Sequence, residues 1–156
     1  MKRILLPALL TLSLVLAACS ATVVQNDPQP APVSGESSSP SNDSAMRIDE
    51  QGEIIFEITP LNLDSPTETF EFDVVMTTHS IDLSMDLATL STLTTDTGVS
   101  VESTLWDAPR GGHHVEGKLI FPATKDGKPI LEGATKLTLT VINVDAPTRI
   151  FEWDLK

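Results

Sequence analysis

Apolar and polar residues alternate with a period of two over much of residues 47–156. In residues 70–76, for example, Phe, Phe, Val and Met alternate with Glu, Asp and Val. This pattern is typical of a strand with one buried face, because successive side chains of a strand point to opposite faces. Six further segments alternate in the same way: Ile54–Ile58, Ile81–Leu87, Val99–Leu105, Val115–Phe121, Leu137–Val141 and Phe151–Leu155. The pattern therefore predicts about seven short strands.

Turn signals separate these segments. They lie at residues 59–66, 96–98, 108–112, 125–129 and 145–147, which are rich in Pro, Gly and Asp. Short strands with regularly spaced turns and no long helical period predict an all-β fold, an antiparallel two-sheet sandwich of immunoglobulin-like or cupredoxin-like topology. One segment is ambiguous, since Leu83, Leu87 and Leu90 would also share one face of a short helix within Asp86–Leu93.

Residues 47–156 hold all seven aromatic residues of the chain. A segment of about 110 residues is long enough to bury one core without disulfides. No internal repeat is visible in it. We therefore expect one β-sandwich domain over residues 47–156.

The N-terminus has the parts of an export signal. Lys2 and Arg3 precede an apolar run from Ile4 to Ala18. The run is too short to cross a bilayer, which takes about 20 apolar residues. It closes with Leu16-Ala17-Ala18-Cys19, which resembles the lipobox of bacterial lipoproteins. The resemblance implies that residues 1–18 are a removed signal peptide and that Cys19 becomes the lipidated first residue of the mature protein.

Cys19 is the only cysteine of the chain, so no intramolecular disulfide can form. Lipidation gives this thiol a use, and two or more acyl chains hold a protein stably on a membrane. No other segment is long and apolar enough to anchor the chain. The sequence therefore predicts a protein attached to a cell membrane by its N-terminal lipid, facing the periplasm or the exterior.

A linker follows the lipobox, over residues 19–46. Ser20 to Met46 contain four prolines, seven serines and no aromatic residue. Such a composition buries too little apolar surface to offset the entropy lost on ordering. We expect a disordered linker with a reach on the order of 30 Å.

The charge is strongly acidic. Without Lys2 and Arg3, the mature chain has 8 basic and 22 acidic side chains, a formal charge of −14. Binding to nucleic acid needs a basic face that this chain lacks, so nucleic acid is excluded as a partner. An acidic surface serves solubility, and it also attracts cations or a basic partner.

The best candidates for a functional site are three histidines, His79, His113 and His114. His79 ends the clearest strand, and the other two follow the Gly111-Gly112 pair. Imidazole is the commonest metal ligand, so the three predict a copper or zinc site if the loops converge. Adjacent residues of an extended chain point to opposite faces, so a shared ion needs the glycine pair to bend the backbone. The alternative is that all three are exposed polar residues at strand ends.

Other chemistry has weaker support. Cupredoxin copper sites use a cysteine thiolate, and Cys19 is expected to carry lipid. Met76 and Met85 are in register with apolar neighbours, as core residues are. The chain has no nucleophile elbow, no His-Glu-x-x-His and no phosphate-binding glycine loop, so we expect no enzyme.

Two segments, Thr78–Ser84 and Trp106–Pro122, resemble a recurring pattern in uncharacterised bacterial envelope proteins. The resemblance implies a shared loop arrangement around the histidines and carries no activity with it. Two hypotheses follow for the whole chain. The first is a lipid-anchored, non-enzymatic interaction or accessory module whose partner is another envelope protein. The second is an envelope protein that binds copper or zinc.

Overall fold

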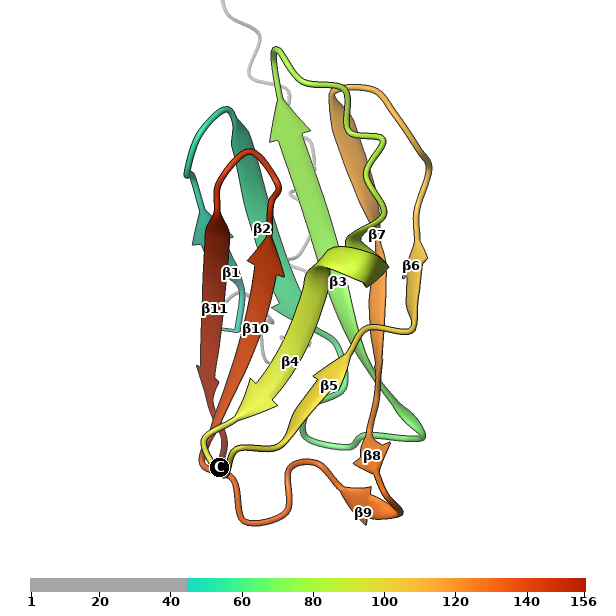
Figure 1. The fold of residues 1–156 in the computed structure, drawn as a ribbon, viewed down its shortest axis with the longest axis vertical. Coiled ribbons are helices and arrows are strands. Elements are labelled where there is room, and N and C mark those ends of the chain that lie inside the picture. Colours follow the sequence, from blue (N-terminus) through green and yellow to red (C-terminus); the bar gives the residue numbers. More distant parts are fainter. Residues whose placement is uncertain (1–44) are drawn as a thin grey trace, which may run out of the picture. The chain divides into compact units, whose positions relative to one another are not determined.

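The structure is a computed structural model, and it describes residues 45–156. The predicted signal peptide, Cys19 and nearly all of the predicted linker lie outside the described residues. The described part is a sandwich of two antiparallel sheets (Figure 1). The all-β, antiparallel two-sheet fold expected from the alternation is confirmed.

The first sheet has five strands in the order β1-β2-β3-β7-β6. Its strands are β1 (Arg47–Asp49), β2 (Ile54–Pro60), β3 (Thr69–Thr78), β7 (His114–Pro122) and β6 (Leu105–Asp107). The second sheet has four strands in the order β11-β10-β4-β5. Its strands are β11 (Thr148–Asp154), β10 (Lys136–Ile142), β4 (Ser91–Thr95) and β5 (Ser100–Glu102). A small hairpin of β8 (Thr124–Lys125) and β9 (Lys128–Pro129) and a 3-10 helix, η2 (Leu87–Leu90), complete the described part.

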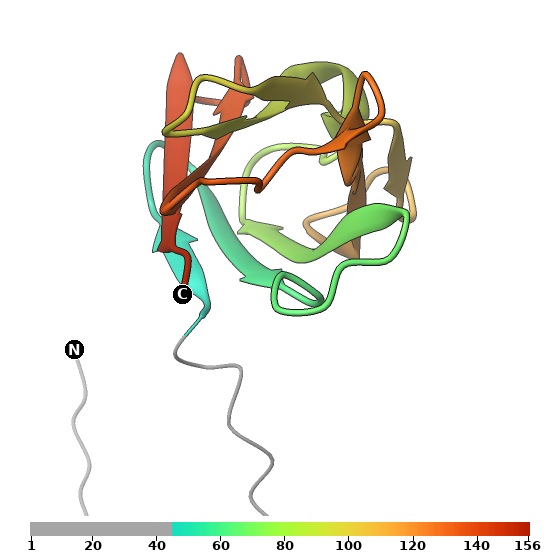
Figure 2. The ribbon, with the colours of Figure 1, turned by 90° about the horizontal axis from the view of Figure 1, so that it is seen from below.

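The core lies between the two sheets, and the alternating apolar residues fill it. Phe56, Phe72 and Leu139 are fully buried. The ring of Phe72 in the first sheet lies 5.4 Å, between centroids, from Trp153 in the second, and 5.7 Å from Phe121. Figure 2, a view from below, shows the strands surrounding the space that these side chains occupy. Burial of these large aromatic side chains is the main force that holds the sheets together.

Five of the seven predicted strands correspond to long strands of the structure. The segments beginning at Ile54, Phe70, Val115, Leu137 and Phe151 became β2, β3, β7, β10 and β11. In each, the apolar positions are buried and their neighbours are more exposed. The period-two pattern therefore located these strands and their inward faces.

The predicted strand over Ile81–Leu87 is wrong. Residues 81–86 form an irregular loop, and Leu87–Leu90 form η2, so the helical alternative holds for these four residues. Asp86 caps η2 because its side chain accepts a hydrogen bond from the Ala88 N–H. Leu83 and Leu87 are buried without belonging to a strand, and this burial explains the misleading alternation.

The predicted strand over Val99–Leu105 is divided between the two sheets. β5 pairs with β4 in the second sheet, whereas β6 pairs with β7 in the first. The chain crosses over at Ser103 and Thr104. The Ser103 N–H donates to the Ser91 carbonyl, and the Thr104 N–H donates to the Ile120 carbonyl of the opposite sheet. The alternation continues through the crossover because it depends only on which side chains are buried, and both sheets bury their inner faces in the same core.

Candidate functional site

The three histidines lie at one end of the first sheet, where β3 ends and β7 begins. The Thr78 N–H donates to the His113 carbonyl over 3.0 Å, and Thr77 Oγ1 lies 3.0 Å from His114 Nδ1. All three imidazole side chains are exposed. Pairing of β3 with β7 thus brings together the two segments that the sequence resemblance had linked.

His114 lies on the outward face of the first sheet. It is the cross-strand partner of Thr77, while the next pair, Met76 and Val115, is buried. Gly111 and Gly112 have φ angles of 86° and 93°, so the sharp bend of this loop comes before His113. Within residues 45–156, no three His, Cys, Asp or Glu side chains are grouped so that they could hold a metal ion. The copper or zinc site on His79, His113 and His114 stays a prediction.

Two loops at this end are tied together, and we call residues 79–86 and 108–113 the loop pair. The Gly112 N–H donates to Asp82 Oδ1 over 2.7 Å. The Leu83 N–H donates to the Gly112 carbonyl, and the Gly111 N–H returns a bond to the Leu83 carbonyl, at 2.9 and 3.0 Å. Together these bonds hold the glycine bend against the loop that follows β3.

A salt bridge of 3.0 Å between Arg110 and Asp86 adds a second tie across the loop pair. Both side chains are partly exposed, so the salt bridge contributes less to the stability of the loop pair than its backbone hydrogen bonds do. Nothing in the sequence alone marks Asp82 or Asp86 for these contacts. Their roles follow from contacts more than 20 residues apart, which spacing does not reveal.

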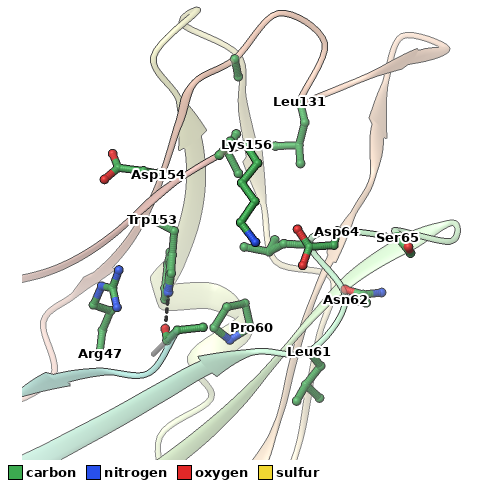
Figure 3. Close-up of a pocket in the computed structure, with 14 residues that line it drawn as sticks. Arg47, Pro60, Leu61, Asn62, Asp64, Ser65, Leu131, Trp153, Asp154 and Lys156 are labelled. Carbon is green, nitrogen blue, oxygen red and sulfur yellow. Dashed lines mark hydrogen bonds between the residues drawn. The ribbon is translucent and has the colours of Figure 1, made fainter. Parts of the chain in front are cut away.

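A pocket of about 770 Å³ lies at the opposite end of the sandwich. Four stretches of chain line it: Ala45 and Arg47, Pro60–Ser65, Leu131 and Ala134, and Trp153–Lys156. Figure 3 shows Leu131 pointing inward and the Lys156 side chain extending toward Asp64. Its size falls in the range of small-molecule sites. No sequence signal marked it, because its walls converge only in the fold.

The strongest contacts of this pocket belong to the fold itself. Trp153 donates its indole N–H to the Ala45 carbonyl over 2.5 Å, and the Arg47 guanidinium lies 5.8 Å from the indole centroid (Figure 3). The side chain of Asn62 donates to the Thr69 carbonyl and accepts from the Glu71 N–H. These polar groups therefore stabilise the walls of the pocket.

Among residues 45–156, three carboxyl groups have displaced pKa values. Burial and the nearby Glu116 raise the pKa of Asp73 above its usual value, against a smaller lowering by Lys118. Burial would also raise the pKa of Asp49, but hydrogen bonds from Gln51 and the charge of Arg149 outweigh it and lower the pKa. Hydrogen bonds from Thr135 lower the pKa of Asp96. Each displacement follows from contacts within the fold, so the three groups affect how the free energy of unfolding changes with pH.

Comparison with known proteins gives little further information. No family model matches the chain, and no curated protein matches it. A solved structure of a DUF4426 family protein from Pseudomonas aeruginosa is similar, with a TM-score of 0.41 and 12% sequence identity. The similarity covers 70% of this chain and 94% of that one. Between residues 45 and 156, no helix has the length and apolar character needed to cross a membrane.

Proposed function

We propose that the protein is an envelope lipoprotein, anchored through lipid on Cys19, whose non-enzymatic β-sandwich is an interaction or accessory module outside the cytoplasm. The single observation that carries this proposal is the sequence Leu16-Ala17-Ala18-Cys19 after a short basic and apolar leader. The cysteine in it is the only one of the chain, so it has no competing role in a disulfide.

The fold is suited to such a module. The described chain begins at Ala45, beside the pocket, whereas the loop pair lies where β3 ends. β3 has 10 residues and runs between these two ends, which separates them by roughly 30 Å at about 3.3 Å per residue. A linker that joins at one end leaves the loop pair at the far end free for a partner in the envelope. The acidic charge favours a basic partner surface over anionic lipid or nucleic acid.

Replacing Cys19 with Ala tests the anchor. Without the sulfur no diacylglycerol can be attached, so lipid labelling should disappear and unprocessed precursor should accumulate. Labelling with a radioactive fatty acid and fractionation of membranes measure both effects. Ser20→Ala is the matched control, and it should be labelled normally. Normal processing and membrane association of Cys19→Ala would contradict the proposal.

A second candidate function is binding of copper or zinc at the loop pair. It is favoured by the hydrogen bonds that join Thr78 to His113 and Thr77 to His114, because they bring all three imidazole residues to one end of β3 and β7. Since the three imidazoles form no ready-made cluster in the described residues, this function requires the exposed loops to adjust around the ion.

Metal binding should raise the melting temperature at neutral pH. An ion at a hundredfold excess over its dissociation constant stabilises a fold by about 2.7 kcal/mol. The increase should fade below about pH 6, because protonated imidazole does not ligate. Thermal unfolding with Cu²⁺ or Zn²⁺ measures it, and His79→Ala and His114→Ala should each reduce it. An equal response of both variants and the wild type would remove these residues from any metal site.

A further inference from the structure

The segment from Ala45 to Gln51, which includes β1, contacts both sheets, and we call it the strap. β1 forms the edge of the first sheet through three residue pairs with β2. On its other side the strap runs along β11, the edge of the second sheet (Figure 1). Arg47 Nε donates to the Glu152 carbonyl over 2.8 Å, and Gln51 Nε2 donates to the Thr148 carbonyl over 3.3 Å. Side chains of the strap thus satisfy carbonyls of β11, which has a neighbouring strand only on the β10 side.

Arg149 of β11 lies beneath the strap and is completely buried. Its guanidinium forms an ion pair with Asp49 and donates to the Gln51 carbonyl over 2.5 Å. It also donates to the Val144 carbonyl over 3.1 Å and lies 4.7 Å from the centroid of the Phe56 ring. Two of its three polar partners therefore belong to the strap. A buried guanidinium is stable only while its charge is paired and its N–H groups are bonded.

The strap and Arg149 depend on each other. A strand of three residues at the end of a domain has too few ladder bonds to resist fraying by itself. Its attachment therefore also relies on contacts with β11, and the only buried ion pair among these contacts is the one between Asp49 and Arg149. When the strap leaves, water reaches Arg149 and replaces its lost partners. The core strands, which are bonded to one another, do not need the strap for their own ladders.

We propose that the strap is a detachable segment, locked by the Asp49–Arg149 ion pair, that can release while the remaining strands stay folded. Its release would add residues 45–51 to the linker, up to about 25 Å of extended chain. It would also uncover the free edges of β2 and β11. The longer reach of the linker depends on the proposed lipid anchor, whereas the Asp49–Arg149 ion pair that holds the strap does not.

Trypsin reports on the strap directly. Between Ile4 and Met46 the chain has no Lys or Arg, so Arg47–Ile48 is the first tryptic bond after the predicted signal peptide. Asp49→Asn removes the charge that pairs with Arg149. On the full chain, we expect this variant to yield the product beginning at Ile48 at least tenfold faster than the wild type. Hydrogen exchange in residues 45–51 should accelerate to a similar degree. In both proteins it should be faster than exchange in β3 and β10, which open only when the whole domain unfolds.

Glu152→Gln is the matched control. It removes the exposed salt bridge to Lys136, at 3.5 Å, and leaves the backbone carbonyl that Arg47 uses. Cleavage at Arg47 should not change. Two results would overturn the proposal: unchanged protection of the strap in Asp49→Asn, or exchange of the strap at the same rate as β3 and β10, which would mean that the strap opens only with the whole domain. Neither readout needs lipid, so a failure here is distinct from loss of lipid labelling at Cys19.

Discussion

Gly117, in the middle of β7, occupies a position where the alternation calls for a core side chain. The structure explains the glycine, because the chain after β6 passes directly over it. A Cβ at Gly117 would overlap Ala108 Cβ and would lie 2.5 Å from the Asp107 carbonyl oxygen. Close approach of two backbones is a recurring reason for glycine within a strand. The side chain that is absent at this position is thus replaced by the neighbouring segment.

Gly117→Ala should therefore destabilise the protein by about 1–3 kcal/mol, the usual effect of overpacking. Urea unfolding of the purified protein measures the change. The double variant Gly117→Ala with Ala108→Gly should recover part of the loss, because it removes the Cβ overlap but keeps the contact with the Asp107 carbonyl. Wild-type stability of the single variant would mean that β6 does not pack over Gly117 as described.

Asp82 determines the conformation of a whole element, the loop pair. Its carboxylate accepts the Gly112 N–H, and it lies against Gly111, where a Cβ would be 3.2 Å from Oδ1. These contacts join the loop after β3 to the loop before β7. Since His113 and His114 follow directly, the Asp82 carboxylate and the backbone bonds of the loop pair together set the orientation of this end of the sandwich.

Asp82→Ala should leave the Gly112 N–H without its partner and destabilise the protein by about 1–3 kcal/mol. Asp82→Asn should cost less, because its side-chain oxygen still accepts a hydrogen bond. Hydrogen exchange of residues 108–114, together with urea unfolding, separates the two variants. If Asn and Ala had equal effects, the charge rather than the hydrogen bond would hold the loop pair.

The response of the whole molecule to acid depends on carboxyl groups whose pKa values are lowered by folding. Asp49 accepts hydrogen bonds from Gln51 and Arg149, and Asp96 accepts them from Thr135. The pKa of each carboxyl is lower in the folded protein than its usual value. A lowered pKa favours the folded state at pH values above the unfolded pKa. This contribution is lost as the pH falls through the folded value. Asp73 acts in the opposite sense, since its raised pKa disfavours the folded state at neutral pH.

The wild type should therefore keep its stability at neutral pH and lose part of it below about pH 4, where these aspartates begin to bind protons in the unfolded chain. Asp49→Asn should be less stable than the wild type at pH 7, and the difference should shrink toward pH 3. Urea unfolding across this pH range measures both curves. A constant difference between the two proteins at all pH values would show that the charge of Asp49 is not involved.

The amino-acid sequence by itself determined where the long strands lie and which face of each is buried. In β2, β3, β7, β10 and β11 the alternation is strictly local, so it needs no knowledge of the partner strand. The sequence also shows the composition change near residue 46 and the segment ending at Cys19 that resembles a lipobox. Likewise, the positions of His79 and His113 at strand ends could be predicted, since both follow or precede long alternating runs.

Only the tertiary structure decided which segments meet. It divided residues 99–105 between the two sheets and turned Leu87–Leu90 into a 3-10 helix, although both segments alternate like strands. It paired Asp82 with Gly112 and Asp49 with Arg149, across 30 and 100 positions of the sequence. Such contacts depend on the packing of both sheets around one core. A periodic pattern shows that a side chain is buried, but it does not show which residues that side chain packs against.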